Sequence, residues 1–409
     1  MLYSFLIHIS SFALKGIACF NNKIKLGVEG RKESFSKIQD KLNNNPKTLW
    51  FHCASLGEYE QGLPVFKALR EKYQSHTIIL TFFSPSGYEI RKNTPIADIV
   101  VYLPLDTKQN AKRFFDLVKP ELTVFVKYDI WPNFLLELKQ RQLRAILISA
   151  VFRKNQPYFK FYGSKLRKAL TAFEHIFVQE AKSKKLIETI GFKNVSISGD
   201  TRFDRVHSQL KTDNTLDFVN EFKNNKLCIV IGSSWPEDEI LWIEFINTNT
   251  HKDVKYIIAP HNIKTNEIEN LTSKLNSKTI LFSKKEGKKL SDYNVMIVDT
   301  IGLLSKIYSY GDIAYVGGAM GNTGLHNILE PAVFGIPIII GKHHKKFPEA
   351  QAMIEHGGVI SISNFKSLNT EVNKLIKDNH LRLKTGELNK KFIKKNTGAV
   401  IQIMDYLRK

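Results

Sequence analysis

The chain has 409 residues, of which 43% are hydrophobic and 24% charged, so its size predicts two or three globular domains, each with its own core. Its 60 Lys and Arg residues outnumber 39 acidic residues, and the net charge of +21 favours anionic partners such as phosphates, nucleic acids or anionic lipid. The alternative is a solvated lysine-rich surface, because no compact Arg-rich or aromatic-interleaved basic block appears. The cysteines form no CxxC pair and no His/Cys cluster, which argues against a disulfide framework or structural zinc and fits a reducing compartment.

The first twenty residues, MLYSFLIHISSFALKGIACF, are apolar but are interrupted by polar residues and by Lys15. They lack a basic n-region and an A-x-A site, so we do not expect a cleaved signal peptide, and the uninterrupted apolar part is short for a membrane span. The basic segment NNKIKLGVEGRK follows. The pattern favours a helix lying in the membrane interface, with Lys and Arg meeting anionic headgroups. The alternative is an ordinary first helix packed on its domain.

After residue 45, short apolar runs alternate with helical patterns, for example DIVVYLPLD before KQNAKRFFDLV and LTVFVKYD before WPNFLLELKQRQ. This alternation predicts a parallel sheet with helices on both faces. The polar stretch DRVHSQLKTDNTLDFVNEFKNNK indicates a link between domains. A second strand and helix series follows it, so we expect two Rossmann-like halves facing a cleft. We expect the last helices, from about residue 369 to 409, to return toward the first half.

The stretch LWFHCASLGEYEQGLPVFKALREKY, residues 49–73, changes from a strand pattern to an amphipathic helix at Ser55-Leu56-Gly57-Glu58. One interpretation is a capping box, in which Ser55 caps the helix and Glu58 reaches back to the backbone N–H of the cap. The other is a catalytic base, because open α/β sheets bind ligands where a strand's carboxyl end meets a helix. The segment alone leaves both interpretations open.

In the second half, YVGGAMGNTGLHNILEPAVFGIPIIIG, residues 315–341, contains a glycine-rich turn whose backbone can approach a ligand closely. We expect a helix from about His326 to offer free N–H groups to a phosphate, and Glu330 to accept hydrogen bonds from ribose hydroxyls. The alternative is a set of tight turns between strand and helix. GSSWPEDE and DTIGLL have the same placement after a strand, so several loops converge at one sheet edge. None is a P-loop.

Six motifs in order resemble one family closely: ASLGEYE (54–60), PLD (104–106), DIWPN (129–133), GDTRFD (199–204), DTIG (299–302) and GLHNILEP (324–331). They are similar to those of the 3-deoxy-D-manno-octulosonic acid (Kdo) transferases, which move Kdo from CMP-Kdo onto lipid A precursors in lipopolysaccharide assembly. The resemblance covers nearly the whole chain, including an apolar N-terminal anchor.

The resemblance implies a GT-B glycosyltransferase that is inverting and metal-independent. It implies three parts: a membrane-associated helix and basic segment (1–40), an acceptor-binding Rossmann-like domain (41–210), and a CMP-Kdo-binding Rossmann-like domain with C-terminal helices (211–409). The expected partners are CMP-Kdo, a lipid A precursor and the anionic inner-membrane surface, on its cytoplasmic face. We expect no cofactor, no metal and no nucleic acid.

The same resemblance assigns the site residues. The family's general base falls on Glu58; a sugar hydroxyl has a pKa far above neutrality, so a carboxylate must take its proton as it attacks the anomeric carbon. The family's basic residue in GDTRFD falls on Arg202, which we assign to stabilising the transition state or the leaving phosphate. The full set is: catalytic, Glu58, Lys127 and Arg202; nucleotide-binding, Pro260, His261, Ile301, Gly302, Leu303, Asn327, Ile328, Leu329 and Glu330; acceptor-binding, Ser55, Gly57 and Asp129.

Three positions depart from the family pattern. Where many members have Glu-Thr-Glu before Leu-Trp-Pro, this chain has Lys127-Tyr128-Asp129, so the charge at Lys127 is inverted relative to the family's acidic residue. The family's Pro-Arg-His reads APHN, and Leu303 replaces a usual Glu. The alternatives to a Kdo transferase are another GT-B enzyme with a different nucleotide sugar and, in another class, a basic nucleic-acid-binding protein.

Overall fold

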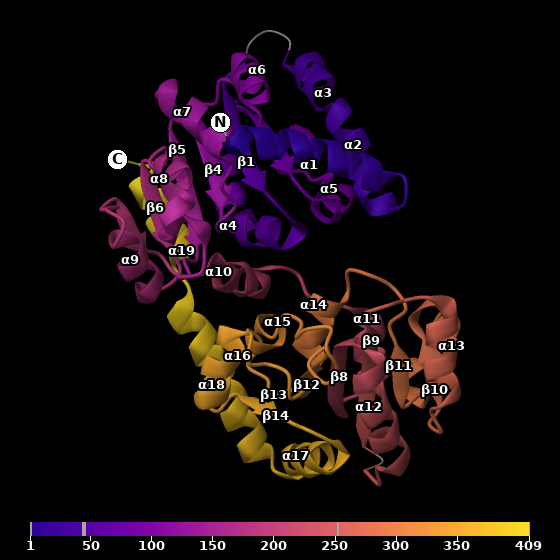
Figure 1. Cartoon of the computed structure of the whole chain (residues 1–409). Coiled ribbons are helices and arrows are strands. Elements are labelled where there is room, and N and C mark those ends of the chain that lie inside the picture. The colour runs from indigo at the N-terminus through magenta and orange to yellow at the C-terminus, as the bar shows by residue number, and fades with distance from the viewer. Residues whose placement is uncertain (1, 43–45, 252, 409) are drawn as a thin grey trace. The chain divides into compact units, whose positions relative to one another are not determined.

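The computed structural model describes residues 2–42, 46–251 and 253–408. The chain divides into two compact units, the first formed by residues up to 205 together with 397–409, and the second by 206–396. Both units are three-layered: a parallel sheet lies between helices (Figure 1). The predicted domain link, near residues 204–226, contains the change from one unit to the other.

The first unit contains a seven-stranded sheet of order β3-β2-β1-β4-β5-β6-β7, and its strand pairs are parallel. The strands are short and almost wholly buried, as expected where helices cover both faces. Their bounds are β1 Thr48–Cys53, β2 Thr77–Phe82, β3 Ile99–Tyr102, β4 Leu122–Val126, β5 Ala145–Ala150, β6 His175–Val178 and β7 Val195–Ile197.

The helices of the first unit begin with three before the first strand. They are α1 Leu2–Ala18, α2 Asn22–Lys32, α3 Ser34–Lys41, α4 Leu56–Lys72, α5 Pro85–Arg91, α6 Lys108–Val118, α7 Pro132–Gln140, α8 Ser164–Leu170, α9 Ala181–Glu188 and α10 Thr201–Ser208, with α19 Ala399–Tyr406 from the C-terminus.

Alternate residues of β1 build the two hydrophobic cores of this unit, because successive side chains of a strand point to opposite faces. Trp50 packs on one face, with its ring 4.7 Å from that of Phe114 and 5.1 Å from that of Phe125. Phe51 packs on the other face and stacks on Phe66 of α4 at 4.4 Å. Burial of these rings on both faces fixes the register of β1 and therefore the position of the turn that follows it.

The second unit repeats this architecture with the strand order β10-β11-β9-β8-β12-β13-β14, again with parallel pairs. Its strands are β8 Leu227–Ser234, β9 Val254–Pro260, β10 Thr279–Leu281, β11 Val295–Ile297, β12 Ile313–Val316, β13 Ile338–Ile340 and β14 Val359–Ser361. Its helices are α11 Asp217–Lys223, α12 Pro236–Thr248, α13 Thr265–Ser273, α14 Leu304–Ile307, α15 Leu329–Ala332, α16 Pro348–Glu355, α17 Phe365–Lys377 and α18 Asn379–Asn396.

The C-terminal segment corrects the predicted range 211–409 for the second domain. Residues 397–409 belong to the first unit, where α19 packs against α4. Ile403 and Leu407 are buried there in the same core as Phe51. Of the helices expected to return, only α19 does so; α17 and α18 stay in the second unit, where Asn389 of α18 donates to Ile336 O at 2.8 Å.

Candidate active site

Glu58 lies in the first turn of α4, directly after the carboxyl end of β1. Its Oε2 accepts the backbone N–H of Ala54 at 2.5 Å, one residue before the helix cap Ser55, and the Ser55 side chain makes no capping hydrogen bond. The capping box considered from the sequence is therefore not formed. Among the described residues no donor reaches the other oxygen, Oε1, and the residue as a whole is only 6% exposed.

The surroundings of Glu58 make its carboxylate a stronger base than an ordinary glutamate. Burial, followed by the negative charge of Asp129, raises the pKa of Glu58 to about 8. The hydrogen bond from Ala54 and the ammonium of Lys127 act in the opposite direction. Three residues selected from the sequence, Glu58, Lys127 and Asp129, are thus brought within electrostatic reach of one another.

Two side chains, His52 and Trp131, contact the same oxygen of Asp129. Its Oδ2 lies 2.9 Å from His52 Nε2 and accepts the indole N–H of Trp131 at 2.7 Å. Lys127, which precedes it, has a left-handed backbone with φ of 69°, a conformation that non-glycine residues adopt at a cost and that is common at functional sites. Its N–H donates to Ile148 O at 2.8 Å, so strand pairing with β5 continues through this strained residue.

The other acceptor residues proposed from the sequence lie in the same turn as Glu58. Ser55 is half-buried and Gly57 is exposed, and a Cβ added to Gly57 would meet only the Ser55 Oγ, at 4.0 Å. The N-terminal turn of α4 is therefore open on this side, with room for an additional group.

Arg202 lies in α10, which follows β7. Its guanidinium pairs with Asp200, with Nη2 2.7 Å and Nε 2.8 Å from Oδ2. Gln61 of α4 donates to the other oxygen of Asp200 at 3.4 Å. The GDTRFD segment thus packs on α4 close to the helical turn that carries Glu58.

Tyr3 is a residue that sequence reasoning missed. Its hydroxyl donates to Oδ2 of the buried Asp106 at 2.7 Å, and Asp106 also accepts backbone N–H groups of Asn133 and Phe134 at the start of α7. Burial, followed by the charge of Asp106, raises the pKa of Tyr3, and the charge of Asp129 contributes. The first turn of α1 therefore lies beside the Asp129 region.

In the second unit the proposed nucleotide contacts follow β9, β11 and β12. His261 stacks on Trp235 with ring centroids 4.4 Å apart, and Trp235 donates its indole N–H to His326 Nε2 at 3.1 Å. The rings of His261 and His326 are 4.5 Å apart. Trp235 thus joins the loops after β8, β9 and β12. Neither Trp235 nor His326 was selected from the sequence, although both stand in motifs that were singled out.

The two histidines of this cluster are held in their neutral form. Burial, followed by the neighbouring His261, lowers the pKa of His326 to about 4. Burial also lowers the pKa of His261. Because Trp235 donates to Nε2 of His326, the proton of the neutral ring is on Nδ1, which makes Nδ1 a donor.

The glycine-rich turn is packed primarily against the protein itself. Buried Asp238 of α12 accepts the N–H groups of Trp235 at 2.9 Å and Gly318 at 2.8 Å and the hydroxyl of Tyr315 at 2.6 Å. A Cβ on Gly317 would lie 2.7 Å from an oxygen of Asp238, and Gly318 has φ of +94°. These two glycines are therefore required by the turn and its contact with α12.

The helix expected from His326 begins later and is short. It is α15, four residues from Leu329, so the predicted helix start is wrong. The first N–H of α15 already has a partner, because Leu329 N donates to Asn327 Oδ1 at 3.2 Å. The N-terminus of α15 therefore has one fewer N–H group available to a phosphate. Asn327 Nδ2 also donates to Glu330 at 3.1 Å. Asn327 and Glu330 thus form a linked polar pair, with the buried Ile328 between them.

The turn 301–303 follows β11, the neighbour of β9 in the sheet. Ile301 is 84% exposed. Gly302 has φ of +97°, and a Cβ added to it would meet nothing within 4 Å, so glycine serves the backbone conformation here. Leu303 is half-buried at the start of α14.

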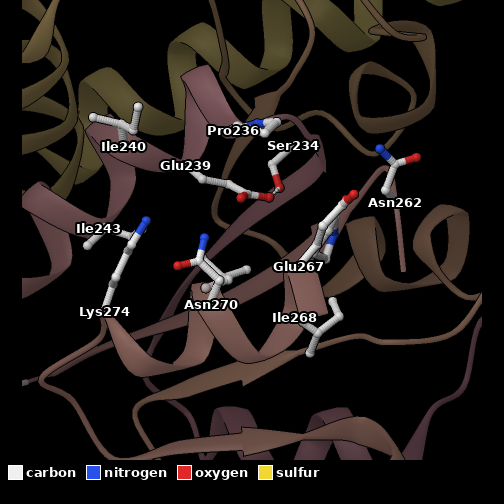
Figure 2. A pocket seen from close by; sticks show the side chains of 12 residues that line it. Ser234, Pro236, Glu239, Ile240, Ile243, Asn262, Glu267, Ile268, Asn270 and Lys274 are labelled. Carbon is white, nitrogen blue, oxygen red and sulfur yellow. Dashed lines mark hydrogen bonds between the residues drawn. The ribbon is translucent and has the colours of Figure 1, made fainter. Parts of the chain in front are cut away.

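A pocket opens between α12 and α13 in the second unit (Figure 2). Figure 2 shows the hydrogen bond from Ser234 Oγ to Glu239, 2.9 Å, on one wall, with Lys274 and Asn270 on another. Of the proposed nucleotide contacts, Pro260 alone contributes to its lining. The pocket therefore adjoins the proposed site and mostly uses other residues.

Among the described residues, no group of three or more His, Cys, Asp or Glu side chains is arranged to hold a metal ion. Within the same residues, the longest apolar helices fall short of what is needed to cross a bilayer.

Comparison with known proteins identifies the family. Residues 29–205 match the family model described as 3-deoxy-D-manno-octulosonic-acid transferase. The 3-deoxy-D-manno-octulosonic acid transferase of Aquifex aeolicus is 31% identical over 83% of this chain and 88% of its own length, and that of Haemophilus influenzae is 27% identical over 89% and 87%.

Solved structures support the fold. UDP-GlcNAc 2-epimerase from Neisseria meningitidis aligns with a TM-score of 0.62 at 14% identity, over 89% of this chain and all of its own. A glycosyltransferase from Rickettsia africae aligns with a TM-score of 0.57 at 15% identity, over 89% and 97%. The predicted GT-B class is confirmed, and the chain is a glycosyltransferase that belongs to the 3-deoxy-D-manno-octulosonic acid (Kdo) transferase family.

Proposed function

We propose that this enzyme transfers Kdo from CMP-Kdo to a lipid A precursor in lipopolysaccharide core biosynthesis, by inverting direct displacement with Glu58 as the general base. The observation that carries this proposal is the environment of Glu58. Its carboxylate is almost buried at the carboxyl end of β1, one oxygen is fixed by Ala54, the other has no donor among the described residues, and the pKa is raised to about 8.

The proposed chemistry requires one base and stabilisation of one leaving group. The acceptor hydroxyl oxygen bonds to the anomeric carbon of Kdo while its proton passes to Glu58. The bond from the anomeric carbon to the phosphate oxygen breaks, and CMP leaves with the electron pair. Arg202 is proposed to stabilise the charge that develops, although its pairing with Asp200 reduces the charge that it can offer.

Lys127 takes a different role in this proposal from the acidic residue that the family usually has there. Its positive charge lowers the pKa of Glu58 and so favours the ionised form that a base requires. Asp129, Ser55 and Gly57 are proposed to receive the acceptor, since Gly57 leaves the turn open and Asp129 has no donor on Oδ1 among the described residues.

The donor is proposed to bind in the second unit, at the loops after β9, β11 and β12. The stacked rings of Trp235 and His261 offer an apolar, aromatic surface, and the Asn327–Glu330 pair offers acceptors for ribose hydroxyls. No metal or cofactor enters the proposed reaction. CMP and CMP-Kdo are the ligands that this set is expected to bind.

The protein is also proposed to act at the cytoplasmic face of the inner membrane, with α1 lying in the interface. Phe12 is 82% and Phe20 is 94% exposed, and the basic α2, with Arg31 and Lys32 in its last turn, follows directly. The contact of Tyr3 with Asp106 would hold the first turn of this helix on the first unit.

The test is transfer in vitro from CMP-Kdo to a tetra-acylated lipid A precursor, read by mass spectrometry as the mass added to the acceptor. CMP-N-acetylneuraminate and UDP-N-acetylglucosamine serve as competing donors. Addition of Kdo alone is the expected result. Transfer from another donor, with none from CMP-Kdo, would favour a different GT-B activity.

A further inference from the structure

His52 occupies a wholly buried position on β1, and each nitrogen of its imidazole has a polar neighbour. Nδ1 lies 2.8 Å from Thr81 Oγ1, since the two residues are register partners on adjacent strands. Nε2 lies 2.9 Å from Asp129 Oδ2. The imidazole therefore connects the interior of the sheet to a carboxylate at its edge.

The hydrogens of this chain of contacts can be assigned from the partners of His52, because an ionised carboxylate such as Asp129 only accepts hydrogen bonds and therefore requires an N–H on Nε2. Thr81 Oγ1 accepts the indole N–H of Trp50 at 2.9 Å, so its own hydrogen must go to another acceptor. With the ring hydrogen on Nε2, the available acceptors are His52 Nδ1 at 2.8 Å and Phe51 O at 3.4 Å, and Nδ1 is the nearer of the two.

This assignment fixes the tautomer of His52. Nδ1 accepts from Thr81, so Nε2 carries the hydrogen and donates it to Asp129. Trp131 donates to the same oxygen of Asp129, and the 2.9 Å contact between Trp131 Nε1 and His52 Nε2 arises because both N–H groups converge on it. Two N–H groups therefore point to one oxygen of Asp129.

We propose that Thr81, His52 and Asp129 form a buried chain that holds Asp129 as a fixed negative charge beside Glu58, and that Thr81 and His52 are positioning residues for the base. The inference rests on the proposed role of Glu58. Thr81 and His52 do not touch substrate in this arrangement; they act through Asp129.

The consequence is control of the protonation of Glu58. The negative charge of Asp129 raises the pKa of Glu58, and Lys127 is the cation that opposes it. The buried thiol of Cys53 on β1 is a further titratable group near Glu58. The other segments packed on α4 carry charges that are paired. These pairs are Arg91 of α5 with Glu60, Glu89 of α5 with Lys92, Arg202 of α10 with Asp200, Arg205 of α10 with Glu60, and Asp405 of α19 with Arg408.

The first experiment measures the tautomer directly, by the ¹⁵N shifts of the imidazoles in the full-length protein labelled at histidine. His52 is expected as the neutral ring with the hydrogen on Nε2, identified by its loss in His52→Gln and by its shift in Asp129→Asn. A neutral ring with the hydrogen on Nδ1 would overturn the proposal, and this measurement requires no activity.

The second experiment follows kcat/KM for Kdo transfer against pH. Asp129→Asn removes the charge itself, and we expect it to move the acid limb to lower pH by about one unit. Thr81→Val removes the hydroxyl but keeps the shape, and we expect a smaller shift in the same direction. Thr81→Ser should restore the limb. The matched control is Thr123→Val, because Thr123 is buried on the adjacent β4 with a hydroxyl that has no partner in the described structure.

The outcomes separate this inference from the proposed function. If the wild type transfers no Kdo, the proposed function is wrong. The ¹⁵N measurement of the His52 tautomer then still tests whether Thr81, His52 and Asp129 form the proposed chain. If the wild type is active but Thr81→Val and Asp129→Asn both keep the wild-type acid limb, only the positioning role is wrong. If Thr81→Val does not fold, Asp129→Asn carries the comparison, because Asp129 lies at the edge of the sheet and its side chain is partly exposed.

Discussion

Glu58 accepts the backbone N–H of Ala54 at 2.5 Å and not that of the helix cap Ser55. A glutamate at this position of a capping box would bond the cap itself. The difference of one residue turns the carboxylate toward the end of β1, and burial there raises its pKa to about 8. The position of Glu58 therefore favours a role as a base over a role in helix capping.

The substitution Glu58→Gln tests the base. Gln keeps the shape and can still accept from Ala54, but it cannot take a proton at neutral pH. We expect CMP affinity near that of the wild type and turnover lower by about 10²-fold or more, the usual scale for loss of such a group. The acid limb of the wild-type profile should be absent from the residual activity. The control is Glu71→Gln, an exposed residue of the same helix. Turnover within a few-fold of the wild type would leave Asp129 as the next candidate base.

The same substitution has an expected effect on stability. The folded-state pKa of Glu58 lies above its ordinary value, because of burial first, so between about pH 4.5 and 8 the folded state binds more protons than the unfolded state and stability falls as pH rises. Glu58→Gln removes this loss. We therefore expect the variant to be more stable than the wild type at pH 8, by about 1 kcal/mol or more, and the advantage to disappear near pH 4. Chemical denaturation at the two pH values measures this difference, and equal stabilities at pH 8 would contradict the raised pKa.

The alternation of strands and helices was sufficient to predict two parallel α/β units, because residues such as Trp50 and Phe51 on β1 are apolar on both faces of the sheet. The position of residues 397–409 could not be predicted in the same way. Ile403 and Leu407 form an ordinary apolar helix face, and nothing in that face indicates which of two similar cores will bury it.

Prediction of the candidate site was limited in a similar way. The Ser55–Glu58 turn is local, so its place after β1 followed from the sequence. The contacts of Asp129 with His52 and of His326 with Trp235 join residues from different strands, and single motifs carry no sign of them. The helix expected at His326 was wrong because α15 begins only at Leu329, where the Asn327 side chain accepts the backbone N–H.

The exposed aromatic residues of the N-terminal segment predict binding to anionic vesicles. Replacement of Phe12 and Phe20 by Ser removes apolar surface that would enter the interface, so the full-length double variant should sediment less with vesicles containing phosphatidylglycerol. CMP binding should be unchanged. Ile240→Ser, at an exposed position of α12 in the second unit, is the control for loss of surface apolarity. Wild-type sedimentation by the double variant would contradict an interfacial helix.

Glu330 is predicted to contribute directly to nucleotide affinity. If its carboxylate accepts hydrogen bonds from ribose hydroxyls, Glu330→Ala should weaken CMP binding by about 1 to 3 kcal/mol, measured by calorimetry. Asn327→Ala tests the neighbour that donates to Glu330 at 3.1 Å and should have a smaller effect. The control is Glu355→Ala, at an exposed position of α16. Wild-type affinity in Glu330→Ala would reduce Glu330 to a structural residue of α15.

Trp235 is predicted to organise the donor site through its indole N–H as well as through its ring. Trp235→Phe keeps an aromatic ring against His261 but removes the donor to His326 Nε2. Without that donor the tautomer of His326 with its hydrogen on Nδ1 is no longer selected, and its pKa should rise above about 4, while burial and His261 still hold it below the ordinary value. We expect weaker CMP binding, by several-fold, with a new pH dependence between about pH 5 and 7.

The matched control for this prediction is Trp242→Phe in α12, the helix that Trp235 precedes, because the indole N–H of Trp242 is buried and has no partner in the described structure. Both variants lose an indole, but only Trp235→Phe loses a hydrogen bond to a histidine. Calorimetry with CMP across this pH range and the ¹⁵N shifts of His326 measure the two effects. Unchanged ¹⁵N shifts of His326 together with unchanged CMP affinity in Trp235→Phe would mean that Trp235 contributes its stacking surface and not its N–H. In that case Trp235→Ala should weaken CMP binding, whereas Trp235→Phe should not.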